Sequence, residues 1–420
     1  MRTVFLSGLA PCVLALSPSS QGSVFVVDDD AGPGVDFGSI QAAVDAAGPG
    51  DVVLVREGAY LPFTVAGKGL TVVGDDGASV VIEGPMGVVA TVVSAIPAGQ
   101  QAVLRNLVFR PPLNVDGDLV RLESSPGVIW LEEVDLEFIL PFPFGYFMNQ
   151  RQALRIEDCD RVVLTRMDVN GLDGATQGQG LETASIPLSA VSSSVYAFDC
   201  IFDAAFGQVL QGEGQTGVEL VDSFLSARSS VLQGGPGGIG SFFMGLEGGV
   251  GGPGADLSAG SELWLIDSFA VGGPGGSNGI FPSGPDGPPT KSDATSAVFE
   301  HVASPVSFQS PGLSDDGSDT DIFFDVDTDP GSMVLLLAEF EADPVFVSAF
   351  ADAVATGLAP VILPLGTTDA AGQLTFFLEP PELPAALDTF DYVLQIAVLT
   401  PTTGLELSNP TLFTLVQEGF

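Results

Sequence analysis

Residues 36–55 read Asp36-Phe-Gly-Ser-Ile-Gln-Ala-Ala-Val-Asp-Ala-Ala-Gly-Pro-Gly-Asp-Val-Val-Leu-Val55. Apolar residues from Ile40 to Ala47 recur at i, i+3, i+4 and i+7, which places them on one face of a helix. Ser39 or Asp36 can cap the first turn, and a glycine and a proline end the helix after residue 47. Because an apolar strand follows at once, the sequence predicts a short helix that covers the start of a β structure.

Short strands continue after this helix, at residues 70–73 and 80–82, and each is closed by turn residues. A segment of the form apolar-x-apolar, then a polar residue and an apolar pair, then recurs along the chain. The aligned polar residues of its seven copies are Asn106, Glu133, Arg166, Asp199, Asp222, Asp267 and His301. They are separated by 27, 33, 33, 23, 45 and 34 residues, which are intervals that stacked repeats produce. One copy alone cannot bury its apolar face, whereas a stack of copies can.

The opening segment, together with Glu57-Gly-Ala-Tyr60 and Leu70-Thr-Val-Val-Gly74, resembles the start of right-handed parallel β-helix proteins of the pectin-lyase-like superfamily. The resemblance implies that the helix caps the narrow end of a solenoid. A mixed βα fold could begin with the same helix, but no second amphipathic helix of useful length is present. The predicted fold class is therefore all-β, with a right-handed parallel β-helix, an N-terminal capping helix and a small antiparallel β-sandwich at the C-terminal end.

Four regions follow from the changes in composition. Residues 1–22 have the order of a secretory signal peptide, with one arginine, an apolar stretch and small residues. Residues 23–310 form the predicted β-helix, 311–331 an acidic linker, and 332–420 the β-sandwich. The last region resembles acidic C-terminal β-modules of large secreted bacterial proteins, which implies surface attachment or a spacer role.

The predicted location is secreted, extracellular or at the cell surface. No segment after the leader approaches the ~18 to 20 apolar residues that span a bilayer. Two cysteines remain after the leader, Cys159 and Cys200, which either form a bridge or lie as buried thiols stacked in neighbouring coils. We favour the buried thiols.

The charge of the chain excludes several classes of partner and reaction. Twelve Lys and Arg residues stand against 53 Asp and Glu residues, so the formal net charge is −41 and nucleic acid is not an expected partner. His301 is the only histidine, which leaves no set of residues for a usual zinc site. Between Gly234 and Gly287 lie 19 glycines, and we expect long turns there that project from one side of the solenoid.

Seven of the 12 basic residues lie between Arg105 and Arg166. If they stack on one face, they form a ladder that can hold uronate or sulfate groups bidentately. The predicted ligand-binding residues are Arg121, Arg155, Arg161 and Arg166. The alternative is that these arginines pair with nearby acids across adjacent coils.

Catalytic motifs of related enzymes are incomplete here. The sequence around Gln152 and Asp173 resembles that of pectin methylesterases, but the nucleophile motif and the arginine of that family are missing. No catalytic residue is therefore predicted. Asp325, Asp327 and Asp329 alternate along an acidic stretch, and oxygen ligands at this density suit Ca²⁺, the one cofactor we expect. The alternative is a solvated acidic segment.

The predicted function is that of an exported β-helix protein that binds or organises polysaccharide at the cell surface without catalysis. Its partner would be a polysaccharide or a cell-surface glycan. The alternative is a carbohydrate-active enzyme, such as a polysaccharide lyase, epimerase or hydrolase, built on the same solenoid.

Overall fold

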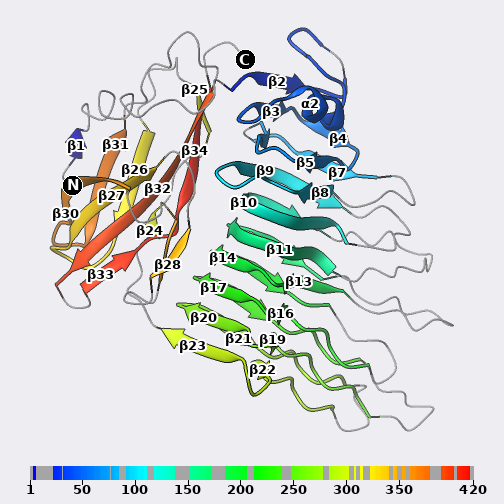
Figure 1. Cartoon of the computed structure of the whole chain (residues 1–420). Coiled ribbons are helices and arrows are strands. Elements are labelled where there is room, and N and C mark those ends of the chain that lie inside the picture. Colours follow the sequence, from blue (N-terminus) through cyan, green and yellow to red (C-terminus); the bar gives the residue numbers. More distant parts are fainter. Residues whose placement is uncertain are drawn as a thin grey trace.

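The computed structural model describes residues 3–5, 22–30, 32–75, 77–84, 91–110, 118–137, 152–171, 185–205, 212–238, 247–277, 283–301, 307–308, 313–315, 322–339, 344–347, 352–355, 360–378, 389–401 and 404–416. In this part of the chain, strands β2 to β23 coil into one long parallel solenoid (Figure 1). The predicted fold class is confirmed.

Each coil between the first and the last contributes one strand to each of three parallel sheets, which we name sheets I, II and III. Sheet I contains β5 (Thr64–Ala66), β8 (Thr91–Ser94), the first parts of β10 (Val120–Leu136) and β11 (Gln152–Thr165), β13 (Ile186–Val191), β16 (Val218–Val221), β19 (Ala255–Ser258) and β22 (Thr290–Ser292). Sheet II contains β2 (Val24–Val27), β3 (Val52–Val55), β6 (Thr71–Gly74), the first part of β9 (Gln101–Arg110), later parts of β10 and β11, β14 (Ser194–Phe198), β17 (Phe224–Arg228), β20 (Glu262–Ile266) and β23 (Ala297–His301). Sheet III contains β4 (Gly58–Tyr60), β7 (Val80–Glu83), the ends of β9 and β10, β12 (Asp168–Asn170), β15 (Ile201–Asp203), β18 (Val231–Gln233) and β21 (Phe269–Val271).

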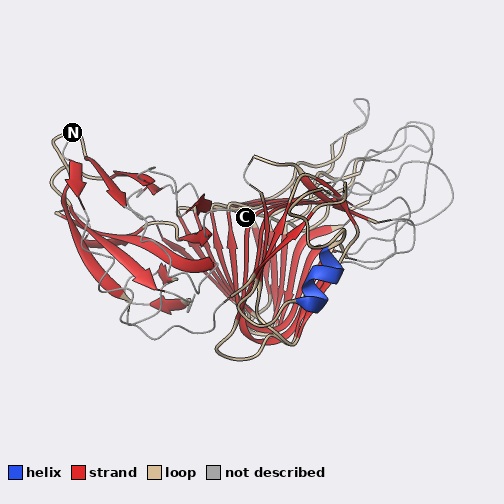
Figure 2. Cartoon of the chain, turned by 90° about the horizontal axis from the view of Figure 1, so that it is seen from above, coloured by secondary structure: helices blue, strands red, loops and turns tan. Residues whose placement is uncertain are grey.

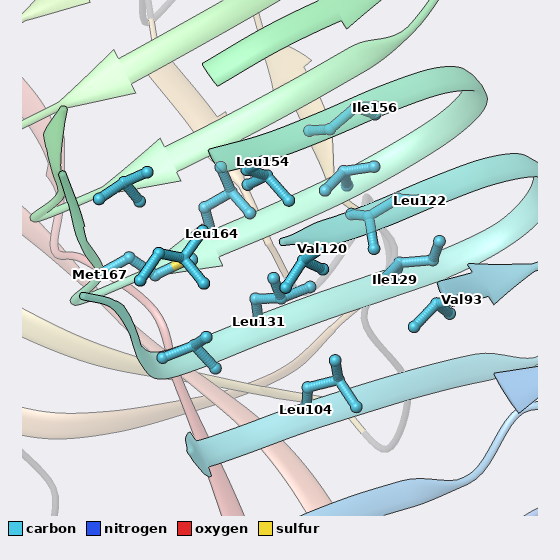
Figure 3. Packing of buried hydrophobic residues seen from close by; sticks show 14 of the residues in the cluster. Val93, Leu104, Val120, Leu122, Ile129, Leu131, Leu154, Ile156, Leu164 and Met167 are labelled. Carbon is cyan, nitrogen blue, oxygen red and sulfur yellow. The ribbon is translucent and has the colours of Figure 1, made fainter. Parts of the chain in front are cut away.

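The interior of the solenoid is a stack of apolar side chains in register. One column of this core consists of Leu104, Leu131 and Leu164, which occupy the same position of sheet II in successive coils. Leu122 and Ile156 do the same in sheet I. Figure 3 shows these side chains meeting between the sheets. Apolar burial of this kind is the main favourable term in folding, and here it requires neighbouring coils, which explains the repeating pattern of the sequence.

The predicted helix is α2 (Ile40–Ala46). Ser39 is its N-cap, and the Ser39 hydroxyl accepts a hydrogen bond from the Ala42 backbone N–H at 3.4 Å. Ile40 and Val44 are buried against the first coils, so the helix covers the N-terminal end of the solenoid (Figure 1).

Two sets of turns connect the sheets, and both use a residue with positive φ. Between sheets II and III these residues are Asn106, Glu133, Arg166, Asp199, Ser229 and Asp267. Asp222 also has positive φ, but it lies between β16 and β17, in the turn from sheet I to sheet II. The predicted copy of the repeat that contains Asp222 therefore begins one strand too early. His301 pairs with Ile266 and is one residue out of the predicted alignment.

The turns from sheet I to sheet II also carry a ladder of buried hydroxyls. The backbone N–H groups of Cys159, Ser193, Ser223 and Ser261 donate to the side chains of Ser193, Ser223, Ser261 and Ser296, at 3.0 to 3.1 Å. Cys159 belongs to this ladder, whereas Cys200 lies in the other set of turns, where its N–H donates to Ser230 Oγ at 3.0 Å. Both thiols are free and buried, but they are not stacked on one another.

Long segments of sequence separate the end of a sheet III strand from the start of the next sheet I strand, and their described parts lie along one corner of the solenoid (Figure 2). Their described glycine-rich parts, which we name the glycine bundle, are residues 212–217, 234–238, 247–254, 272–277 and 283–289. These segments are bonded to one another, since the N–H groups of Gly235, Gly252, Gly273 and Gly287 donate to the carbonyls of Gln215, Gly235, Gly252 and Gly273, each at 2.8 Å. A second row runs through Gly238, Gly249, Gly276 and Gly284, at 2.8 to 2.9 Å.

Within a segment of the glycine bundle, the donating glycines are three residues apart, as in Gly249 and Gly252. Three residues are one turn of the polyproline II helix, whose backbone groups are free to bond to neighbouring chains. The insertions are therefore packed, extended segments rather than the simple long turns that the sequence predicted.

The C-terminal module consists mainly of antiparallel sheets. One contains β24 (Ser307–Phe308), β26 (Ile322–Asp327) and β31 (Gln373–Leu378), with β1 (Thr3–Phe5) added in parallel at its edge. Another contains β25 (Leu313–Asp315), β34 (Thr411–Val416), β32 (Thr389–Thr400), β27 (Met333–Glu339), β30 (Val361–Thr367) and β33 (Gly404–Leu407). β28 (Val345–Val347) and β29 (Asp352–Val354) form a hairpin. Residues 311–331, predicted as a linker, contain β25 and β26, and β1 falls within the predicted signal peptide.

The module packs against the outer face of sheet II (Figures 1 and 2). Trp130 is fully buried in a cluster that includes Val393 of β32. The ring of Phe346, on β28, lies 4.6 Å from that of Trp264 and 5.3 Å from that of Phe224, centroid to centroid. The solenoid and the module therefore share an apolar interface along several coils.

Candidate functional site

Two of the predicted arginines are neighbours on the outer side of sheet I. Arg121 on β10 is directly opposite Arg155 on β11, in parallel register. Asp118 lies between them, with its Oδ2 at 3.6 Å from Arg121 Nε and 3.8 Å from Arg155 Nη1. Arg121 also pairs with Glu123, and Arg155 with Glu157. About a third of each arginine side chain remains exposed.

Asp118 is the buried member of this group, which we name the sheet I cluster. Its residue exposure is 7%. Burial raises the pKa of the Asp118 carboxyl above its ordinary value, although Arg155 and Arg121 act to lower it. The cluster thus holds a desolvated carboxyl beside two partly solvated guanidinium groups.

Three buried polar atoms of the sheet I cluster make no hydrogen bond within the described part of the chain. They are Asp118 Oδ1, Arg121 Nε and Gln152 Oε1. Asp118 and Gln152 are neighbours in adjacent coils, because their offset of 34 residues is that of the pair Val120 and Leu154. Buried polar atoms in proteins are nearly always hydrogen-bonded, so it is unusual that two acceptors and one donor have no partner among the described residues, which leave out 111–117 and 138–151.

The other two predicted arginines lie elsewhere, so the four do not form one ladder. Arg161 is on the part of β11 that belongs to sheet II, opposite Val128. Arg166 is in a turn between sheets II and III, where it pairs with Glu132 and with Glu133, the latter at 3.0 Å. Arg155 and Arg166 pair with acids of the adjacent coil, as the alternative predicts, whereas the pairs Arg121–Glu123 and Arg155–Glu157 lie within one strand.

A second charged group lies under the C-terminal module, and sequence reasoning did not identify it. Glu132 is fully buried, with Arg105 Nε 4.0 Å from Glu132 Oε2. Thr411 Oγ1, from β34 of the module, donates to Glu132 Oε1 at 3.3 Å. Burial lowers the pKa of Arg166, but the charges of Glu132 and Glu133 more than offset this and raise it. We name Arg105, Glu132 and Arg166 the interface charges, of which Arg105 and Glu132 are buried and Arg166 has 26% of its side chain exposed.

The remaining candidates do not form a reactive group. Burial raises the pKa of the Cys159 and Cys200 thiols to about 12, which keeps them protonated and unreactive at neutral pH. Asp327 is exposed at the end of β26, Asp329 lies in the turn after it, and Asp325 is on β26 with a side chain outside the described set. Among the described residues, no group of three acidic, His or Cys side chains is placed to hold a metal ion. The calcium site stays a prediction. Asp173 lies outside the described residues.

Sequence reasoning also missed Asp118. Its only signal is that offset of 34 residues to Gln152, a position already noted for its resemblance to an esterase glutamine. The sequence alone does not show that these two residues are neighbours, because the length of the insertion between the two coils is known only from the strand register.

Comparison with known proteins gives no family. No protein-family model matches the chain, and no curated protein matches it. Among solved structures, the chain is similar to the tailspike protein gp49 of Acinetobacter baumannii bacteriophage Fri1, a capsular polysaccharide depolymerase. The identity is 11%, the TM-score is 0.23, and the match covers 94% of this chain and 89% of that chain. A TM-score this low supports no argument about function, and the fold assignment rests on the strand register of this chain.

Within the described residues, no helix has the length and apolar character needed to cross a membrane.

Proposed function

We propose that the chain is a polysaccharide-binding β-helix protein and that the sheet I cluster is its binding site. The observation that carries the proposal is the convergence of Asp118 Oδ1, Gln152 Oε1 and Arg121 Nε, three buried polar atoms without hydrogen-bond partners among the described residues. They lie beside two partly exposed arginines in register. Such a site has more hydrogen-bonding capacity than the described side chains use.

The chemistry of the cluster fits an acidic sugar. The acceptors on Asp118 and Gln152 can receive hydrogen bonds from sugar hydroxyls, which are donors. Arg121 and Arg155 keep exposed N–H groups that can hold a carboxylate or sulfate in a planar, bidentate arrangement. Parallel strands place such groups about 4.8 Å apart from coil to coil, which suits a polymer that contacts more than one coil.

The binding test uses polygalacturonate and the double variant Arg121→Ala/Arg155→Ala. Loss of two charge-assisted contacts is expected to raise Kd at least about tenfold, which is about 1.4 kcal/mol. Arg110→Ala is the matched control, because Arg110 is a similarly exposed arginine that pairs with Glu137 on sheet III. Isothermal titration calorimetry measures both. An unchanged Kd in the double variant would refute the site.

A second candidate function is catalysis on the same polysaccharide. The observation that favours it is that burial raises the pKa of Asp118, which is the direction of shift that a general acid requires. Glu123 and Glu157 would then be the partner acids. Release of reducing or unsaturated ends from polygalacturonate, alginate or sulfated glycans separates an enzyme from a binding protein.

Asp118→Asn is expected to flatten the dependence of stability on pH. The carboxyl keeps its proton to a higher pH in the folded chain than in the unfolded chain. As pH rises above about 3.9, the unfolded chain binds fewer protons than the folded chain does. The free energy of unfolding therefore falls. Asparagine has no such proton, so the variant should lose less stability between pH 4 and pH 7 than the unaltered chain while it binds polygalacturonate more weakly.

Urea unfolding at the two pH values measures this effect. Asp30→Asn, at an exposed carboxyl in a turn of the first coil, serves as the control and should leave the pH dependence unchanged. A steeper loss of stability in Asp118→Asn than in the unaltered chain would contradict the prediction.

Export, a cell-surface location and membership of the pectin-lyase-like superfamily belong to the same proposal. They are supported by the leader-like residues 1–22 and by the helix that caps a three-sheet coil.

A further inference from the structure

The outer face of sheet III carries two parallel columns of side chains near the C-terminal end of the solenoid. One column runs through Asp168, Ile201, Val231 and Phe269 in successive coils. The other runs beside it through Asn170, Asp203, Gln233 and Val271. One column is mainly apolar and the other mainly polar, so together they form a two-sided strip along the solenoid axis.

The apolar column is unusually exposed. The exposed fraction is 66% for Phe269 and 47% for Ile201, and Val271, at the end of the polar column, is 46% exposed. These side chains are close in space because their strands are bonded in register, with only the half-buried Val231 between Ile201 and Phe269. A contiguous exposed apolar surface with a polar rim is typical of a binding surface.

The charges on this face decide which partner fits. Asp135, Asp168 and Asp203 are on sheet III strands, and Glu137 directly follows β10, where it pairs with the neighbouring cation Arg110 at 3.0 Å. Burial raises the pKa of Asp135, and the charges of Asp168 and Glu137 act in the same direction. Such a face repels polyanions, and it also opposes a second copy of this chain, which would bring the same carboxylates together.

A neutral sugar chain meets these conditions. Sugar rings have flat C–H faces that pack on apolar and aromatic side chains, while their hydroxyls bond to carboxylates and amides at the edge. The strip repeats once per strand, at about 4.8 Å, and it runs in a straight line, as an extended chain does.

We propose that the outer face of sheet III is a second binding surface, for a polysaccharide without acidic groups. Its apolar contacts are Ile201, Val231 and Phe269, and its hydrogen-bonding groups are Asn170, Asp203 and Gln233. This surface extends the proposed function, because it lies on a different sheet from the sheet I cluster and takes a ligand of different charge.

The test measures binding of cellohexaose, chitohexaose and mannohexaose to the full chain by calorimetry. Phe269→Ala is expected to weaken binding of the preferred oligosaccharide about tenfold, since the variant loses the aromatic face on which a sugar ring would pack. Leu61→Ala and Ile362→Ala are matched controls, with exposed fractions of 59% and 56% at sites away from the strip, and both should leave Kd unchanged.

The two binding proposals can fail separately. Arg121→Ala/Arg155→Ala should lose polygalacturonate but keep the neutral oligosaccharide, and Phe269→Ala should show the reverse. Absence of binding to all three oligosaccharides would overturn the sheet III proposal. So would concentration-dependent self-association that Phe269→Ala abolishes, because the strip would then be a contact between copies of the chain.

Discussion

Glu132→Ala is expected to lower the free energy of unfolding by about 3 to 5 kcal/mol, which is the usual cost of removing one partner from a buried ion pair. Glu132 is fully buried and Arg105 is 1% exposed, so the arginine charge would be left in a desolvated place without its carboxylate. The change also removes the acceptor of Thr411, which is a contact between the module and the solenoid. Urea unfolding, followed by circular dichroism, measures the loss.

The adjacent acid provides the control for this experiment. Glu133 pairs with the same Arg166 as Glu132, at 3.0 Å, but 41% of its side chain is exposed. Surface ion pairs contribute only about 0 to 1 kcal/mol, so Glu133→Ala should be nearly neutral. Equal losses in the two variants would show that burial under the module is not what makes Glu132 important.

Gly252→Ala is the second change with a large expected effect. A Cβ at this position would lie 2.0 Å from the carbonyl oxygen of Gln215 and 2.6 Å from its carbonyl carbon, both of them backbone atoms. The segments would have to separate, which breaks the hydrogen bonds from Gly252 to Gly235 and from Gly273 to Gly252. Overpacking of this kind costs about 1 to 3 kcal/mol and occasionally more.

Hydrogen exchange at the amides of Gly235, Gly252 and Gly273 reports this change directly, because each amide donates across the glycine bundle. We expect their protection to fall in Gly252→Ala while protection in sheets I to III is kept. Gly38→Ala is the control, since no atom lies within 4 Å of the added Cβ. Unaltered protection in Gly252→Ala would mean that the insertions do not pack as described.

The solenoid was predictable because its causes are local and repeated. The helical spacing from Ile40, the Ser39 cap and the apolar-x-apolar strands each follow from neighbouring residues. The phase of one repeat was wrong because the turns before sheet II and those before sheet III both use a polar residue with positive φ between apolar strands. Asp222 and Ser229 therefore match the same pattern, and only the register separates them.

Other features depend on contacts between distant segments. Glycines three residues apart are visible in the sequence, but their partners lie in other coils. The sequence does contain a signal that the module covers sheet II. Trp130, Val163 and Tyr196 make the strands of sheet II apolar on both faces, which is typical of a sheet buried on both sides. The sequence identifies Arg121 and Arg155 as candidates. It does not show that they lie opposite each other beside Asp118, because the long insertion between the two coils hides the strand register.

The hydroxyl ladder through Ser193, Ser223 and Ser261 makes every turn of that set equivalent, since each gives an N–H to one neighbour and takes one from the other. A whole coil could be duplicated or lost during evolution without any turn missing its partner. The C-terminal module restricts this freedom, because it spans from the coil of Trp130 to that of Trp264 and would no longer fit a longer or shorter stretch. Relatives of this protein should therefore gain or lose coils mainly outside the stretch that the module covers. Within the covered stretch, the number of coils should stay the same.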